Sequence, residues 1–361
     1  MGEIMAGRIG ILVCALGMAW GASAGDETVI PNGQSGIAAK YPGDKGIEKD
    51  PAVVVHEPFE GQKEFKDFLK GVWTDVRNKG GRCMEFSESV PEASPGKRSL
   101  AIKANRGHDE GGMLFASLKK GYDTLFARVY VRFAEDSNYL HHAFIASLSA
   151  RINPKPWPQG GAGTRPRGDQ WFGMNLEPSA KGPNGTYAPP PGSWHFYGYW
   201  HQMQSKWGTT FGPGKLTPVK RGEWICTETM IRANSAPDKK DGALACWIDG
   251  ELLGWWGPEG VKGKWKDRWV RNGRSGEEFS GFSWRTTDRL KLNQLSLGVY
   301  MSGSDRAAQK TERRLAKFPD IKANRQVQAI YFDDLVVATK YIGPVFKEKP
   351  GTEAATGPGL K

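Results

Sequence analysis

From Pro51 onward the chain consists of short segments in which apolar and polar residues alternate, or in which β-branched and aromatic residues are dense. Clusters of glycine, proline, asparagine and aspartate separate these segments. Successive side chains of a strand point to opposite faces, so the pattern predicts half-buried strands joined by turns. We expect strands within residues 52–59, 99–104, 125–134, 141–150, 171–178, 193–203, 223–232, 243–253, 292–301 and 329–342.

The composition agrees with a strand-rich globular protein. The 361 residues include 47 Gly and 23 Pro, which are too many helix breakers for a helical bundle or a coiled coil. They also include 16 Phe, 14 Trp and 10 Tyr, which a disordered chain would not carry. Together these features predict an all-β sandwich of two antiparallel sheets. Helical periodicity is limited to a turn or two at residues 63–69 and a charged stretch at residues 306–317.

The first 24 residues have the pattern of a secretory signal peptide. Arg8 precedes an apolar run over residues 9–20, and Ala22-Ser23-Ala24 forms a cleavage pattern. The run is too short to span a membrane and no lipobox precedes Cys14, so we expect a secreted or periplasmic protein without a membrane anchor. We expect an extended segment at residues 25–50, one domain at 51–345 and a flexible tail at 346–361.

The net charge is +11, from 50 Lys and Arg against 39 Asp and Glu. Such a charge favours an acidic partner. Export and the scattering of the basic residues along the chain argue against nucleic acid, so we expect an anionic polysaccharide as partner and a monomeric protein.

Three cysteines follow the signal peptide, so at most one disulfide forms within the exported chain. Cys226 and Cys246 lie in two predicted strands joined by the turn sequence ANSAPDKKDG, and a hairpin places them near each other. We therefore predict a Cys226–Cys246 disulfide, with free buried thiols as the alternative. No pair of cysteines has the spacing of a zinc or redox site.

Three long insertions interrupt the predicted sheets, at residues 152–170, 255–285 and 304–326. Long loops within a compact sheet protein more often form functional rims than scaffold, so these segments are candidates for the walls of a cleft.

Several segments together resemble the secreted jelly-roll polysaccharide lyases of concanavalin-like fold: the glucuronan lyases, more loosely the alginate lyases, and the related cellulose-induced secreted proteins of fungi. The resemblance is carried by EPFEGQ, GKRSLAIKA, ARVYVRF, HHAFIASL, GEWICTETMIRANS, DGALACWIDGELL, LSLGVYMSG and IYFDDLVVATKYIGP, in the order in which the family has them. It covers most of residues 51–344 apart from the insertions. The resemblance implies a two-sheet jelly roll with a concave face on which an oligosaccharide lies.

The resemblance also implies a structural calcium ion where the first and last strands meet. The ligands it suggests are Glu60, Ser99 and Asp333, with Asp334 as the alternative to its neighbour. Hard oxygen ligands from distant strands suit calcium. The competing interpretation is that these are ordinary polar groups at a sheet edge.

Strand alternation selects a polar and aromatic face on two of the predicted strands. Within residues 193–203, the odd-numbered side chains from 195 to 201 are histidine and tyrosine, which are costly to bury and natural on the floor of a sugar-binding cleft. In residues 141–151 we likewise expect the odd-numbered side chains to share one face. The predicted face contains His141, Ser147, Ser149 and Arg151 from one strand and His195, Tyr197, Tyr199 and His201 from the other.

Polysaccharide β-elimination needs a cationic or amide group on the uronate carboxylate, a base that removes the C5 proton, and an acid that protonates the leaving oxygen. All three kinds of group occur on these strands. The candidates are Arg151 or Asn175 for the carboxylate, His195 or His141 for the base, and Tyr197 or Tyr199 as base or acid, with His201 and Tyr300 as further substrate contacts.

The resemblance implies that His141, rather than His142, is the strand histidine of the family. One departure concerns the strand WFGMNLEP, where relatives carry an arginine and a histidine and this chain has Phe172, Gly173 or Met174.

The sequence favours a polysaccharide lyase that acts on an acidic, uronate-containing polymer. A non-catalytic polysaccharide-binding protein of the same fold is the alternative, because alternate aromatic residues also form stacking platforms for sugars. A glycoside hydrolase is less favoured, since no strand carries the alternating carboxylates that such an enzyme needs. Glu228 is expected to be a packing carboxylate rather than an acid or base.

Overall fold

The computed structural model describes residues 30–108, 110–154, 161–182, 185–203, 205–260, 262–266, 268–271 and 276–347. The predicted signal peptide and most of the predicted C-terminal tail lie outside these ranges. The described residues from Pro31 onward belong to one compact unit. Within the described ranges, no helix is both long and apolar enough to cross a membrane.

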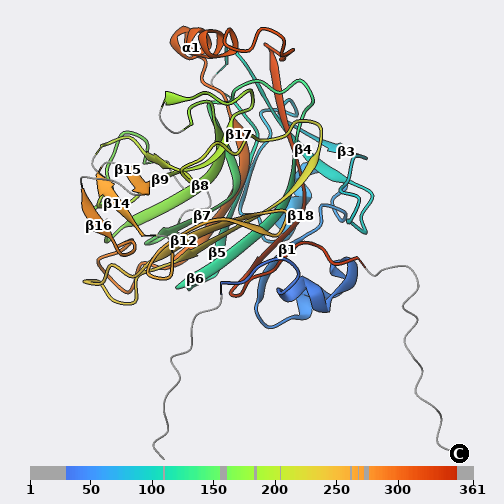
Figure 1. The fold of residues 1–361 in the computed structure, drawn as a ribbon. Coiled ribbons are helices and arrows are strands. Elements are labelled where there is room, and N and C mark those ends of the chain that lie inside the picture. Colours follow the sequence, from blue (N-terminus) through green and yellow to red (C-terminus); the bar gives the residue numbers. More distant parts are fainter. Residues whose placement is uncertain are drawn as a thin grey trace, which may run out of the picture. The chain divides into compact units, whose positions relative to one another are not determined.

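The predicted all-β sandwich is confirmed: two large antiparallel sheets make up the described fold (Figure 1). The first sheet has the order β13-β12-β11-β6-β18-β4-β3, with β1 also paired to β18. The last strand of the chain therefore lies in the middle of this sheet. The strands are β1 (Val53–Glu57), β3 (Met84–Ser87), β4 (Ser99–Asn105), β6 (Thr124–Phe133), β11 (Trp224–Arg232), β12 (Ala243–Ile248), β13 (Glu251–Trp256) and β18 (Val327–Ala338).

The second sheet has the order β10-β9-β8-β7-β17-β5-β2. Its inward side chains are apolar, as on β8, where Phe172, Met174 and Leu176 are each buried in the common core. Their inward orientation explains why Phe172 and Met174 are not replaced by charged residues, since a charged side chain there would lie between the two sheets. The strands are β2 (Asp75–Arg77), β5 (Met113–Tyr122), β7 (His142–Arg151), β8 (Trp171–Ser179), β9 (Ser193–Tyr199), β10 (Thr209–Phe211) and β17 (Leu292–Tyr300).

A bulge in β7 changes which residues face outward. Ala146 has a positive φ of 44°, and the pairing of β7 with β8 shifts register between Ile145 and Leu148. Before the bulge Ala143 and Ile145 are buried, and after it Leu148 is buried. The predicted face on this strand was therefore wrong in its first half. His142, not His141, begins the strand and shares the outer face with Ser147, Ser149 and Arg151.

The described part of the N-terminal segment, from residue 30, is folded, although an extended segment was expected at residues 25–50. It forms the short 3₁₀ helices η1 (Ile37–Lys40), η2 (Pro42–Asp44) and η3 (Ile47–Lys49). Ile37 and Ala38 donate backbone hydrogen bonds to Tyr341 and Ile342, which lie just beyond the last strand. The two ends of the described chain are thus joined beside the first sheet, and their contacts bury Asp44.

Two of the three predicted insertions contain their own secondary structure. Residues 255–285 include a three-stranded sheet of β14 (Gly263–Lys266), β15 (Arg268–Arg271) and β16 (Glu277–Phe279). Residues 304–326 include α1 (Asp305–Leu315), which Ser304 caps by accepting a hydrogen bond from the Ala307 amide. The other predicted helical turn is η4 (Phe65–Lys70). In Figure 1 the small sheet and α1 lie on different sides of β8 and β9.

The predicted Cys226–Cys246 disulfide is wrong, because both cysteines are free and buried. Cys246 pairs with Thr229 across the hairpin, three residues from Cys226. Cys226 packs with Tyr130 and Val345 outside the sandwich, whereas Cys246 belongs to the main core. The two thiols point to opposite faces of the sheet, which a disulfide cannot bridge.

Candidate functional site

The outer face of β7, β8 and β9 gathers the polar residues of the second sheet. The register of β8 and β9 places Asn175 opposite Tyr197 and Glu177 opposite His195. Their neighbours in sequence, such as Phe196, point into the core, so the alternation forces these side chains outward. Three strands thus contribute to a continuous polar surface.

Glu177 lies between two histidines. Its carboxylate oxygens are 3.2 and 3.1 Å from Nδ1 of His142, and one of them is 3.8 Å from Nε2 of His195. The same carboxylate accepts a hydrogen bond from the Ala143 amide at 3.2 Å. The side chain of Glu177 is only 5% exposed. A buried carboxylate in this position fixes both imidazole rings and supplies a negative charge beside them.

The two histidines differ in pKa although they share Glu177. Burial lowers the pKa of His142, but the charge of Glu177 and its hydrogen bond outweigh this and raise the pKa above 6.5. Burial lowers the pKa of His195 below 6.5, and Glu177 offsets this only in part. Protonation is therefore more favourable at His142 than at His195. Neighbouring groups with diverging pKa values are what acid–base chemistry requires.

The hydrogen bond of His195 identifies its tautomer in the neutral form. Its Nδ1 lies 2.8 Å from the carbonyl oxygen of Glu177, and a carbonyl only accepts, so Nδ1 carries the proton. In the neutral ring, Nε2 is then left with a lone pair that can receive a proton.

Tyr197 and Tyr199 are adjacent on the same face, with their hydroxyl oxygens 3.0 Å apart. The Gly208 amide donates to the Tyr197 oxygen at 3.1 Å. Burial, followed by the hydrogen bond with Tyr199, raises the pKa of Tyr197 well above 10. The Tyr197 ring centroid is 4.8 Å from that of His142. Tyr197 is therefore a proton donor at neutral pH and not a tyrosinate.

Asn175 and Arg151 lie on the other side of this centre. The Ser147 hydroxyl donates to Asn175 Oδ1, which orients the amide and leaves its NH₂ group as a donor. The Arg151 guanidinium lies over the Trp171 ring, 5.2 Å from its centroid. Trp171 in turn contacts Tyr199, at 5.4 Å between ring centroids. This end of the surface combines a cation with aromatic faces, which suits a sugar acid.

A cavity of about 260 Å³ opens beside the histidine pair. Its lining includes the side chains of four residues that can accept or donate a proton: His141, His142, His195 and Tyr197. His141 precedes β7, and its ring centroid is 5.2 Å from that of Tyr300. The remaining described lining consists of Arg106, Leu140, Pro178, Ser179, Ala180, Met301, Ser302, Ala307, Ala308, Lys310, Thr311 and Arg314.

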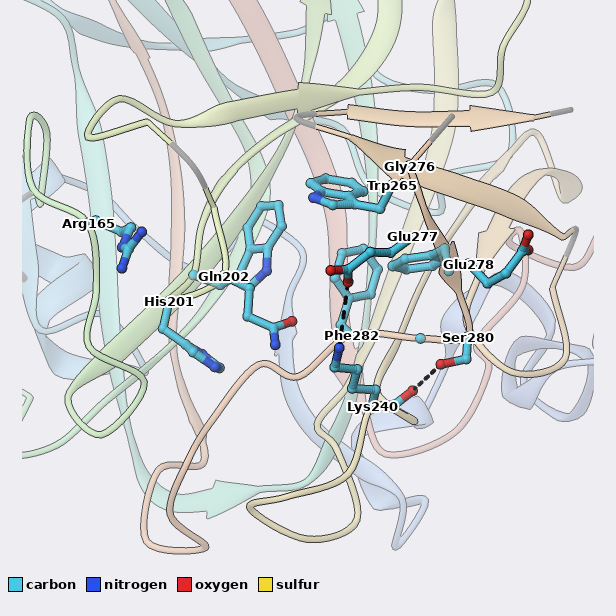
Figure 2. Close-up of a pocket in the computed structure, with 13 residues that line it drawn as sticks. Arg165, His201, Gln202, Lys240, Trp265, Gly276, Glu277, Glu278, Ser280 and Phe282 are labelled. Atoms are coloured by element: carbon cyan, nitrogen blue, oxygen red, sulfur yellow. Dashed lines mark hydrogen bonds and ion pairs between the residues drawn. The ribbon is translucent and has the colours of Figure 1, made fainter. Parts of the chain in front are cut away.

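His201 belongs to a different and larger cavity, of about 650 Å³ (Figure 2). Figure 2 shows His201, Gln202 and Arg165 on one side of this space and Trp265 with Glu277 on another. Lys240 Nζ is 3.9 Å from Glu277. The structure therefore does not place His201 with the histidine pair, although both positions were predicted for one face.

Of the residues suggested for calcium, Asp333, Asp334 and Glu60 lie near one another. Asp333 and Asp334 are fully buried, and each has one carboxylate oxygen without a hydrogen bond. Burial raises the pKa of both, and the negative charge of Glu60 contributes in each case. Glu60 Oε1 accepts hydrogen bonds from the amides of Lys97 and Arg98.

Ser99 lies beside the Asp333 position in the sheet, since its neighbour Leu100 pairs with Phe332, and its hydroxyl donates to the Ser89 carbonyl. Ser94 approaches both aspartates and was not foreseen. Among the described residues, no group of three or more His, Cys, Asp and Glu side chains is arranged to hold a metal ion. The two orphaned carboxylate oxygens nevertheless suit a cation with oxygen ligands.

Three residues of the site were not identified from the sequence: Glu177, His142 and Arg106. Glu177 falls on the odd-numbered face of WFGMNLEP, so strand alternation was a usable signal for it. His142 was missed because the bulge at Ala146 changes which residues of β7 face outward, and the sequence Ala146-Ser147 does not indicate a bulge. Arg106 follows β4 and reaches the site only through the packing of α1, with which it shares an ion pair across 206 positions.

Comparison with known proteins supports the fold. No family model matches the chain, and no curated protein matches it in sequence. Among solved structures, a variant of the alginate lyase Aly36B in complex with an alginate tetrasaccharide is similar over 80% of this chain and 98% of its own, with 12% identity and a TM-score of 0.50. The alginate lyase vAL-1 from Chlorella virus is similar over 80% and 99%, with 10% identity and a TM-score of 0.50.

A further similar structure is the endo-β-1,4-glucuronan lyase from the fungus Trichoderma reesei, with 13% identity, coverage of 80% and 95%, and a TM-score of 0.43. The two alginate lyase structures with a TM-score of 0.50 confirm the resemblance to jelly-roll polysaccharide lyases for the fold. What the site of this chain does has to be argued from its own residues.

Proposed function

We propose that the protein is a polysaccharide lyase that cleaves a uronate-containing polymer by β-elimination on the outer face of β7, β8 and β9. The observation that carries the proposal is the shared carboxylate of Glu177, which lies 3.1 Å from Nδ1 of His142 and 3.8 Å from Nε2 of His195, while the pKa of His142 is raised and that of His195 is lowered. The similar solved lyases support the proposal through their fold.

His195 is the proposed base. Its Nδ1 proton is held by the Glu177 carbonyl, so Nε2 receives the C5 proton of the uronate. The electron pair of the C5–H bond forms the C4–C5 double bond as the C4–O4 bond breaks. Proximity to Glu177 stabilises the imidazolium that results.

Tyr197 is the proposed acid. Its raised pKa keeps the hydroxyl protonated, and it gives that proton to the departing O4. The Gly208 amide, which donates to the same oxygen, stabilises the negative charge that develops on it. Proton exchange with water restores both side chains.

Asn175 is the proposed partner of the uronate carboxylate. Because Ser147 holds the amide oxygen, the NH₂ group is directed to an acceptor on the substrate. Hydrogen bonds that strengthen as the C5 carbanion forms lower the barrier for proton removal.

A hydrolytic reaction is less compatible with the cavity. Glycosidases need two carboxyl groups that flank the scissile bond. None of the described residues that line the cavity beside the histidines is Asp or Glu.

Incubation with a panel of polyuronates tests the proposal. Cleavage by β-elimination gives a product whose C4–C5 double bond, conjugated to the carboxyl group, absorbs in the ultraviolet. We expect absorbance to rise with at least one uronate polymer and not with a neutral glucan. Retained binding without absorbance across the panel would instead establish the protein as a non-catalytic polysaccharide-binding protein.

We also propose a structural calcium ion held by Asp333 and Asp334, with Glu60 nearby. The support is the pair of buried carboxylate oxygens without hydrogen bonds, since buried charge needs compensation. The ion would join β18 to the segment after β1 and has no role in the proposed reaction.

A further inference from the structure

The cavity beside the histidine pair has a strongly cationic wall. Arg106, Lys310 and Arg314 line it, the latter two from α1, and no acidic residue is among its described lining. This wall is built by the insertion at residues 304–326 and by the end of β4. The proposed reaction assigns it no role.

Arg106 is the best-defined member of this wall. Its side chain is 10% exposed, and Nη1 donates to Glu312 Oε1 at 2.6 Å. Nε and Nη2 are buried and have no hydrogen bond. Unsatisfied buried donors on a charged group are costly, so an arrangement of this kind indicates a missing acceptor.

Lys310 and Arg314 reinforce the positive charge. Both line the cavity from α1, one helical turn apart, and Lys310 has the cations Arg314, Lys181 and Arg306 around it. The nearby carboxylate of Glu312 is already shared between Arg106 and Arg325. The cluster therefore carries an excess of positive charge that an anion would neutralise.

We propose that this cationic wall binds an anionic group, a carboxylate or a sulfate ester, on the sugar next to the one that is cleaved. The inference rests on the proposed function, because His142, His195 and Tyr197 line the same cavity. Asn175, the proposed partner of the reacting carboxylate, is not among its lining residues. The site thus provides for two anionic groups, and the preferred polymer carries charge on successive sugars.

Calorimetric binding tests the wall without requiring turnover. The ligands are a glucuronate trisaccharide, a sulfated cellotriose and unmodified cellotriose, and the variants are Arg106→Gln and Lys310→Gln. Arg313→Gln, an exposed residue of α1 outside the cavity lining, is the matched control for the loss of one positive charge from that helix. Lys310 is exposed and has no described ion pair, so its variant keeps the test valid if Arg106→Gln does not fold.

We expect each wall variant to weaken binding of a charged trisaccharide on the order of tenfold, since a hydrogen bond to a charged group contributes roughly 1.5–3 kcal/mol. Arg313→Gln and all measurements with cellotriose should show little change. If the variants lose affinity only for the glucuronate ligand, the wall is a carboxylate site. If they lose affinity only for the sulfated ligand, it is a sulfate site. Equal affinities for the charged ligands in wild type and both wall variants would overturn the inference, whether or not the protein has lyase activity.

Discussion

Glu228 on the first sheet and Glu177 on the second are both buried carboxylates on the outer face of a sheet, and they differ in what covers them. Glu228 accepts hydrogen bonds from the amides of Ile342 and Gly343, each at 2.8 Å. Glu177 instead faces the rings of His142 and His195 beside an open cavity.

The same contrast holds for the arginines. Arg128, fully buried on the first sheet, binds Asp44 and the carbonyls of Gly343 and Asp334. Among the described residues, Arg106 has two nitrogen atoms without a hydrogen bond, Nε and Nη2, whereas Arg128 has one, Nε. Buried charge that the chain's own backbone satisfies holds the molecule together, whereas buried charge that faces a cavity is available to a ligand.

The largest expected effect is on turnover. Tyr197→Phe removes the proposed acid, and His195→Gln removes the proposed base. Loss of one general acid or base lowers the rate by roughly 10²–10⁴-fold. We expect this loss in the initial rate of product absorbance, with the melting temperature close to wild type. Full activity in both variants would place the reaction elsewhere on the molecule.

Arg128→Met should lower the stability of the protein and leave its turnover rate unchanged, the reverse of the two catalytic variants. It leaves Asp44 buried without its partner, which costs roughly 3–5 kcal/mol of unfolding free energy. Chemical denaturation measures this loss, and the matched control is Arg313→Gln. The rate per folded molecule should remain unchanged, and a parallel fall in that rate would break the distinction between the two faces.

Glu177→Gln should change the pH dependence of kcat/KM. In the wild type, kcat/KM falls at low pH when His195, the proposed base, whose pKa lies below 6.5, becomes protonated. The variant removes the negative charge of Glu177, which raises the pKa of His195 against the effect of burial, so the low-pH limb should move to lower pH. An unmoved low-pH limb would show that His195 is not the base.

Calcium removal should have the smallest effect. A chelator is expected to lower the melting temperature by a few degrees, because a ligand that binds only the folded state stabilises it. Asp333→Asn should abolish this response while Glu177→Gln retains it. The same melting temperature with chelator and with added calcium would exclude the ion.

Strand alternation was enough to predict the sandwich and the outward direction of His195, Tyr197 and Tyr199, since period-two patterning is a local property. It failed on β7, where one extra residue at Ala146 reversed the faces. The disulfide failed for a related reason, because proximity in a hairpin does not fix the face on which each thiol lies.

Arg106 and Glu312 show a different limit. The two residues are in contact across 206 positions, and neither has a local pattern that pairs it with the other. The cationic wall therefore depends on the tertiary path of the insertion that contains α1. Sequence periodicity carries no information about such a path.

The central place of β18 has a consequence for how the molecule assembles. This strand is the last in the described chain, yet it pairs with β1, β4 and β6. The first sheet stays split until residues 327–338 have been synthesised, so cooperative folding of the sandwich must wait for this segment. Pairings this distant in sequence are slow to form.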